Sequence, residues 1–261
     1  DGRGAGIVIQ PALVAGLRRC GLSSDDDLGV QVQERVTLDG QGRELGRTPQ
    51  VQTLTSWSRL YQMLHQWLPS SCYRQGMTVS RVDQTPEGVR VQTTEGALEA
   101  DILIAADGIR SAVRAQLWPR IQPEYAGYVA WRGVCDEALL SQRTLSTAFG
   151  YFGFCLPPGE QLIGYPVAGP GNRTQAGHRG YNFVWYRPAP APLALQALLT
   201  DADGVRHPLG IPPHKVSWLN VSDMRADARR LLAPQFAEMI EKTALPFLQP
   251  IFDLVSAELV Q

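Results

Sequence analysis

The sequence predicts a mixed α/β fold in two parts, with an α/β domain over residues 1–122 and an antiparallel sheet over residues 123–261. The first observation is the short apolar run at residues 102–105, which is typical of a strand covered on both faces in a parallel sheet. The second is the change after Pro123 to alternating, aromatic-rich segments, a pattern that favours antiparallel strands. With 261 residues, 44% of them hydrophobic, the chain can bury one large or two small cores.

Residues 101–114, DILIAADGIRSAVR, are predicted to form a strand, a turn and a helix. Asp107-Gly108 marks the turn, because glycine adopts the positive φ that an abrupt reversal needs. The first turn of the helix leaves backbone N–H groups unpaired, and Ser111 and basic residues stand nearby, so an anion site is one interpretation. An ordinary strand, turn and helix with a turn aspartate is the other.

The segments before this stretch have clear periodicities. A helix is expected to begin at Gln10 and Pro11 and to end near Gly21. Residues 30–53 alternate as a β-hairpin with an Asp-Gly turn. A second helix follows, with Thr55 or Ser56 as its cap. Residues 77–100 then indicate a meander of short strands.

Four segments after Pro123 are predicted to be successive antiparallel strands: YAGYVAWRGV, TAFGYFGFCL, QLIGYPVAG and GYNFVWYRP. Pro157-Pro158-Gly159 is the expected hairpin turn between two of them. Residues 222–242 form a helical pattern that Ser222 would cap and Pro234 would interrupt.

Composition excludes several classes of function. A formal net charge of −1 gives no general attraction to nucleic acid or to anionic membranes. No apolar run is long enough to span a bilayer, so we expect a cytoplasmic protein. The cysteines and histidines show neither a disulfide framework nor the spacing of metal ligands. The cysteines are Cys20, Cys72, Cys135 and Cys155.

Several separated motifs resemble one family in the right order. DILIAADGIRSAVR resembles the Asp-Gly motif of the FAD-dependent aromatic hydroxylases, the class A flavoprotein monooxygenases. GAGIVIQPALVAGL, YAGYVAWRGV, NFVWY and DMRADARRLLAPQFAEMI resemble other elements, in the branch that includes 2,6-dihydroxypyridine 3-hydroxylase and salicylate-hydroxylase-like enzymes. The resemblance implies an FAD/NAD(P)-binding Rossmann-like domain over residues 1–122 and a substrate domain over residues 123–261.

The resemblance also implies two segments that the sequence does not contain. A GxGxxG βαβ unit would precede Gly4, and a Gly-Asp segment would follow the last residue. We therefore expect the Rossmann-like domain to be incomplete, and FAD binding to be weak if these residues are the whole protein.

The resemblance further implies sets of binding residues. Trp57 stands where many members carry an FAD-contacting arginine, a departure that an aromatic ring packed on the cofactor would accommodate. The implied cofactor-binding residues are Gly4, Ala5, Gly6, Ile7, Gln10, Trp57, Val79, Asp107 and Gly108. The substrate-binding candidates are Tyr128, Arg132, Tyr151 and Trp185. Core packing is the alternative for the aromatic ones, because alternation puts half of a strand's side chains on the far face. No catalytic residue and no metal site is assigned.

The function implied is an FAD-dependent monooxygenase that hydroxylates a small aromatic or heteroaromatic ring with NAD(P)H and O₂. In such enzymes a flavin C4a-hydroperoxide delivers oxygen to the ring, so the protein must hold the flavin and exclude water. Two alternatives remain open: a related flavoenzyme (an epoxidase, a reductase or a hydroxylase of large substrates), and a non-catalytic fragment that acts as a binding or oligomerising module. The expected partner is a small aromatic substrate, with a homodimer left open.

Overall fold

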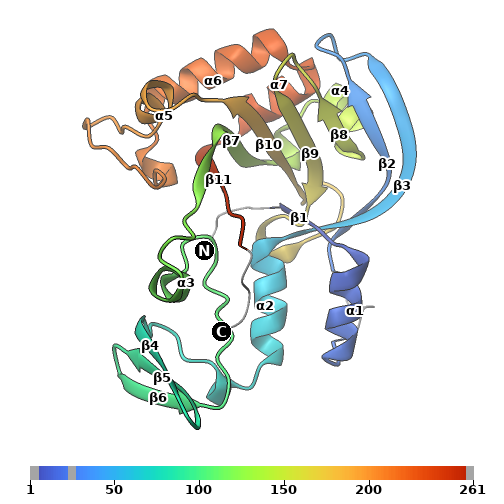
Figure 1. The fold of residues 1–261 in the computed structure, drawn as a ribbon. Helices are drawn as coiled ribbons and strands as arrows, with labels where there is room; N and C mark the ends of the chain where they lie inside the picture. Colours follow the sequence, from blue (N-terminus) through green and yellow to red (C-terminus); the bar gives the residue numbers. More distant parts are fainter. Residues whose placement is uncertain (1–5, 23–27, 257–261) are drawn as a thin grey trace. The chain divides into compact units, whose positions relative to one another are not determined.

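The computed structural model describes residues 6–22 and 28–256 (Figure 1). These residues form two compact units, each described by itself. The larger unit runs to Trp67 and continues over residues 127–250, and the smaller unit holds residues 68–126 and the residues from 251 onward. The domain division expected at residue 122 stays a prediction. No helix in the described ranges is long and apolar enough to cross a membrane.

A mixed sheet forms the frame of the larger unit. Among the described residues it has eight strands, in the order β1-β3-β2-β8-β9-β10-β7-β11. β2 and β8 run parallel, whereas β8, β9, β10 and β7 are joined by antiparallel pairs. The antiparallel sheet predicted after residue 123 is therefore confirmed. The strands are β1 (Gly6–Val8), β2 (Val30–Leu38), β3 (Glu44–Ser56), β7 (Glu124–Asp136), β8 (Phe152–Cys155), β9 (Gln161–Val167), β10 (Gly180–Pro188) and β11 (Phe247–Asp253).

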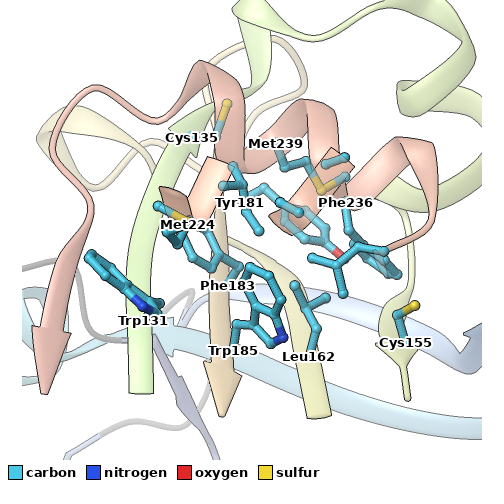
Figure 2. Packing of buried hydrophobic residues seen from close by; sticks show 14 of the residues in the cluster. Trp131, Cys135, Cys155, Leu162, Tyr181, Phe183, Trp185, Met224, Phe236 and Met239 are labelled. Carbon is cyan, nitrogen blue, oxygen red and sulfur yellow. The ribbon is translucent and has the colours of Figure 1, made fainter. Parts of the chain in front are cut away.

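Two helices seal one face of this sheet (Figure 2). Because side chains alternate along a strand, every second residue of β7, β9 and β10 points to this face. The cluster joins large side chains from the sheet to Met224, Phe236 and Met239 on the helices. The sheet side chains labelled are Trp131, Cys135, Cys155, Leu162, Tyr181, Phe183 and Trp185. The helices of this unit are α1 (Pro11–Arg19), α2 (Trp57–Trp67), α4 (Gln142–Thr144), α5 (Leu193–Leu198), α6 (Trp218–Leu231) and α7 (Pro234–Lys242), and α6 and α7 are the two that seal the face.

The start of α6 corrects the expectation that Ser222 caps it. The helix begins one turn earlier, where the Ser217 hydroxyl accepts a hydrogen bond from the Leu219 N–H at 3.3 Å. The earlier start carries Val221 into the core on the same face as Met224. The expected interruption at Pro234 is confirmed, because α7 begins at this proline, where its missing N–H costs no helical hydrogen bond.

β8 is shorter than the predicted strand TAFGYFGFCL. Residues Leu145–Phe149 form one turn of π-helix, and the strand begins only at Phe152. Ala148 and Phe149 are consecutive and both buried in the core, an arrangement that a strand's alternation does not allow. The turn predicted at Pro157-Pro158-Gly159 is confirmed, with Gly159 at φ +73° between the antiparallel β8 and β9.

The predicted early elements are also confirmed. The helix after Gln10 is α1, and Gly21 follows it at φ +80°. The hairpin is β2 and β3. The Ser56 hydroxyl accepts a hydrogen bond from the Arg59 N–H at 3.1 Å at the start of α2.

The smaller unit is built on the predicted meander. Its described part contains a three-stranded antiparallel sheet, one α-helix and a short 3-10 helix at Ser70–Cys72. Val113 of the helix packs against the buried valines of the sheet, and the Gln116 side chain accepts a hydrogen bond from the Val82 N–H at 2.9 Å. These elements are β4 (Val79–Thr85), β5 (Gly88–Thr93), β6 (Gly96–Ala100) and α3 (Ala112–Leu117).

Residues 102–105 correct the prediction of a doubly covered strand. They form no strand, and the side chains of Ile102 and Ile104 are 78% and 84% exposed. A strand needs a neighbour for its backbone hydrogen bonds, and no strand in the described ranges pairs with this run.

We expect Phe236→Ala to lower the free energy of unfolding by about 3 to 5 kcal/mol, because a fully buried ring leaves a cavity between α7 and the sheet. Trp218→Ala is the control, since this side chain is 73% exposed, and its effect should stay within about 0.5 kcal/mol. Urea unfolding followed by circular dichroism measures both, and similar losses in the two variants would contradict the packing described.

Candidate functional site

The face of the sheet opposite α6 and α7 carries the candidate site, and we call it the second face. Cross-strand partners point to the same side, so the register aligns three rows of side chains on it. An apolar cluster with Val8, Val32 and Leu54 covers part of the second face. The rows are Val134, Asn182 and Tyr165; then Arg132, Val184 and Ile163; then Ala130, Tyr186 and Gln161.

The first row meets β1. The Gly6 N–H donates a hydrogen bond to Asn182 Oδ1 at 3.0 Å. A side chain cannot replace this glycine's hydrogen, because an added Cβ would lie 2.5 Å from a ring carbon of Tyr165 and 2.8 Å from Asn182 Cγ. We call this contact of Gly6, Asn182 and Tyr165 the inner end of the second face.

Asn182 is fully buried, and its Nδ2 has no hydrogen-bond partner among the described residues. A buried donor without a partner costs about 1 to 3 kcal/mol. The Gly6 N–H fixes the orientation of the amide, since only Oδ1 can accept from it. Burial raises the pKa of Tyr165 to about 12, so its phenol is neutral near pH 7.

Four of the sequence-predicted cofactor residues lie near this end. Gly6 and Ile7 pair with Ser56 and Thr55, which directly precede Trp57 at the start of α2. Gln10 is the N-cap of α1, a short distance along the chain. Trp57 is 45% exposed, and its ring stacks on that of Tyr61 with centroids 5.1 Å apart. Gly4 and Ala5 lie outside the described residues.

Val79, Asp107 and Gly108 lie on the smaller unit. Asp107 Oδ2 accepts hydrogen bonds from the N–H groups of Ala112, at 2.9 Å, and Val113, at 3.4 Å. The Asp107 carboxylate therefore occupies two of the backbone N–H groups at the start of α3. One interpretation of the sequence assigns these groups to a bound anion. Partial burial raises the pKa of Asp107, but hydrogen bonds from the Ser111 hydroxyl and these amides outweigh it and hold the pKa below its usual value. Gly108 has the expected positive φ, +79°.

The four substrate-binding candidates lie in different parts of the larger unit. Tyr128 lies on β7 beside Tyr186, and Arg132 lies in the second row of the second face. Trp185 is fully buried on the helix-covered face. Tyr151 precedes β8 and lies under the Arg47 guanidinium, 4.6 Å from its ring centroid. The structure thus separates Tyr128 and Arg132 from the other two.

A hollow of about 740 Å³ opens at the other end of the strands. The rings of Tyr128 and Tyr186 meet edge to face in its wall, with centroids 5.8 Å apart. Glu160 and Arg187 add an ion pair with 3.1 Å between Oε1 and Nε. The lining residues are Gly127, Tyr128, Gly159, Glu160, Gln161, Ile163, Tyr186, Arg187 and Pro188.

Sequence reasoning missed Asn182 and Glu160. Asparagine in an aromatic strand is the signal that could have identified the first, since a polar residue at an inward position needs partners. Glu160 follows a Pro-Pro-Gly turn, and charged residues are common after turns. Nothing in the sequence therefore marks Glu160 as a functional residue.

We expect Asp107→Ala to loosen the start of α3 by about 1 kcal/mol, because two helix N–H groups lose their acceptor. The folded-state pKa is lowered, so this contribution is present above the ordinary value of 3.8 and is lost as the pH falls through the lower, folded value. Amide hydrogen exchange of Ala112 and Val113 measures it. Asp107→Asn keeps an acceptor and is the control; equal exchange in all three proteins would contradict the capping role.

We expect Asn182→Ala to free β1 from β10, because the Gly6 N–H loses its acceptor and a void replaces the amide. Hydrogen exchange at the Gly6 amide should accelerate about 10-fold or more. The lost hydrogen bond stabilises the closed state by about 1 kcal/mol, and the void left by the amide adds to the loss. Asn220→Ala on α6 removes an amide whose Nδ2 is bonded to Ala197 and Leu198 carbonyls, and it should leave Gly6 unchanged. Unchanged Gly6 exchange in Asn182→Ala would rule out the contact.

Comparison with known proteins finds an FAD-binding family and aromatic-ring monooxygenases as relatives. Residues 125–253 match the family described as FAD binding domain-like. Over 255 residues, 97% of this chain, the sequence is 29% identical to 2,6-dihydroxypyridine 3-monooxygenase of Paenarthrobacter nicotinovorans and covers 63% of that protein. It is 33% identical over 180 residues, 64% of this chain and 44% of the relative, to 3-amino-4-hydroxybenzoate 2-monooxygenase of Streptomyces cremeus.

The fold agrees with these sequence matches. The structure of 2,6-dihydroxypyridine-3-hydroxylase from Arthrobacter nicotinovorans superposes with a TM-score of 0.90 and 28% identity, covering 100% of this chain and 65% of that one. The chain therefore spans less than two thirds of the length of these relatives. Sequence and fold together identify the chain as related to the FAD-dependent aromatic hydroxylases, the class A flavoprotein monooxygenases.

Proposed function

We propose that the protein containing this chain is an FAD-dependent monooxygenase that hydroxylates a small aromatic or heteroaromatic ring with NAD(P)H and O₂. The observation that carries the proposal is the 29% identity over 97% of the chain to a 2,6-dihydroxypyridine 3-monooxygenase. The aminohydroxybenzoate monooxygenase is a second relative that, by its name, acts on a single substituted ring. A cytoplasmic location and a homodimer stay predictions.

The residues at the inner end fit a flat cofactor with polar edges. Trp57 and Tyr61 present a stacked, exposed aromatic surface, and the Asn182 amide has a buried donor without an acceptor. We assign Gly6, Ile7, Gln10 and Trp57 to the flavin side of the site, with Gly4 and Ala5 before them. Val79, Asp107 and Gly108, which belong to the smaller unit, stay proposed cofactor-binding residues, Asp107 by placing the flavin for reduction. When bound, FAD would supply the activation of oxygen and its transfer to the ring.

Arg132 is proposed to orient the substrate. Its Nη1 donates to Gln249 Oε1 at 2.9 Å, while its buried Nε has no partner among the described residues. A guanidinium in this state can donate to a hydroxyl, a ring nitrogen or a carboxylate of a bound ring. Tyr128 lies four positions from Arg132 along β7, in the wall of the hollow, and is proposed to contact a substrate ring outside the reacting position. Tyr151 lies under Arg47 and Trp185 is buried on the helix-covered face, so both would support the sheet and not contact the substrate.

The chain's remaining task is to keep water from the reacting ring. The stacked rings of Phe152 and Tyr165, 5.0 Å apart, and Val134 give the first row an apolar surface. Tyr165 stays protonated because of its raised pKa, so it serves as a hydrogen-bond donor at neutral pH and not as a base.

The test is turnover by the complete protein reconstituted with FAD. We expect ring-dependent NAD(P)H oxidation and a hydroxylated product with hydroxypyridines, salicylates or hydroxybenzoates, and none with polycyclic substrates. Arg132→Met should lower kcat/KM about 10- to 100-fold, the range of a hydrogen bond from a charged group. Arg230→Met is the control, because that guanidinium is 66% exposed on α6.

Activity confined to polycyclic substrates would overturn the substrate class. Stoichiometric FAD without ring-dependent oxidation would favour a different flavoenzyme reaction, and failure to bind FAD would favour a binding module.

A further inference from the structure

We propose that the hollow between Tyr128, Tyr186 and Glu160 is a binding site of its own, for a neutral, flat ring that carries an N–H or O–H donor. All of its lining residues belong to the larger unit, so binding there needs neither FAD nor the smaller unit. The proposal therefore goes beyond the hydroxylase reaction.

The wall of the hollow suits an aromatic ring. Tyr128 and Tyr186 already meet edge to face, and their remaining ring edges and faces can continue that arrangement with a third ring. Ile163 adds an apolar surface. A volume of about 740 Å³ lies within the range of small-molecule sites and holds one ring with its substituents.

Glu160 determines which ring is preferred. Its Oε1 accepts from Arg187 Nε at 3.1 Å, while its Oε2 is shielded from water and has no partner among the described residues. Arg187 is also bonded to Asp227 Oδ2 at 2.8 Å, so its position has a second support. The torsion about the last bond of a glutamate is broad, and a turn of the carboxylate that brings Oε2 to a donor in the hollow loosens the Oε1 contact, while Asp227 still holds Arg187. Because Arg187 balances the charge of Glu160, the ligand needs a donor and not a positive charge.

The hollow is separate from the inner end. Tyr186 and Asn182 are four positions apart on β10, about 13 Å at 3.3 Å per residue. A ring held between Tyr128, Tyr186 and Glu160 therefore lies away from Asn182, although the hollow also reaches Ile163, two positions from Tyr165 on β9. Since the ligand class matches the ring substrates proposed above, the hollow would hold such molecules beside the reaction site; this role rests on the proposed function, whereas the binding does not.

The experiment uses the complete protein without FAD and two probes, 4-fluorophenol and 4-fluoroanisole, which differ in the O–H donor. Titrations followed by ¹⁹F NMR give both dissociation constants. We expect wild type to bind the phenol about 10-fold more tightly than the ether. Glu160→Gln should abolish or reverse this preference, because the amide that replaces Oε2 donates where the carboxylate accepted.

Asp227→Asn is the matched control, since it removes the same charge from the other side of the same arginine. It should keep the preference for the phenol. Tyr186→Leu should weaken both probes by a similar factor, and Arg132→Met should change neither. Circular dichroism and thermal unfolding check that each variant is folded. If Glu160→Gln does not fold, Gln161→Phe, which fills the hollow from an exposed position, should displace both probes.

The proposal is overturned if wild type binds the two probes equally or not at all, or if Asp227→Asn loses the preference as Glu160→Gln does. It is likewise overturned if Arg132→Met abolishes binding, which would place the probe at the inner end. None of these outcomes depends on FAD, so failure of the hydroxylase assay and failure of this site are distinguishable.

Discussion

The rest of the larger unit depends on the alternation of side chains across its sheet. α6 and α7 need one face for Trp131, Phe183 and the other core residues, so every second position of β7, β9 and β10 is committed to packing. The intervening positions face the other side, where only some of them, such as Tyr165 and Val134, pack in an apolar cluster. They also carry Arg132 and Asn182, which no hydrophobic core would select. Packing against α6 and α7 therefore uses one face of the sheet and leaves positions on the second face available for a functional site.

Buried polar groups in this unit are partly paired and partly without partners. In the scaffold, buried Glu137 accepts from Arg179 and from two backbone N–H groups, and although burial raises its pKa, the arginine's hydrogen bonds hold the pKa below its usual value. Glu238 similarly accepts from Ser141 at the start of α4. On the second face and in its hollow, polar atoms of Asn182, Arg132 and Glu160 have no partner in the described residues, and buried atoms of Tyr181 and Trp185 in the helix-covered core have none either. What points to a ligand is therefore the position of the first three, at the inner end and beside the hollow, together with their missing partners.

The sequence predicts the strands, turns and most helices, because periodicity and turn residues are local properties. It does not tell which half of a strand faces the helices, so Arg132 and Trp185 were equal candidates until the register placed them on opposite faces. Residues 102–105 look like a buried strand because an apolar run indicates burial. It does not show whether a neighbouring strand is present to pair with the run. Ser222 had the right chemistry for a cap, yet burial of Val221 required an earlier start. Asn182 stands out in its aromatic strand, but nothing in the sequence indicates that its partner is Gly6.

That contact has a consequence for the order of folding. It joins positions 176 residues apart, and the pairing of β2 with β8 joins Arg35 to Phe152, also far apart in the chain. Closing such long loops costs entropy before any contact repays it, so the local hairpins and the pair α6 and α7 are favoured as early structure. β1 can pair with β3 early, but its contact with Asn182 forms only after β10 is in place. The proposed flavin side would therefore be completed late, and a chain slowed at this step would leave Val8, Val32 and Leu54 without the partners that cover them, a hazard for aggregation in the cell.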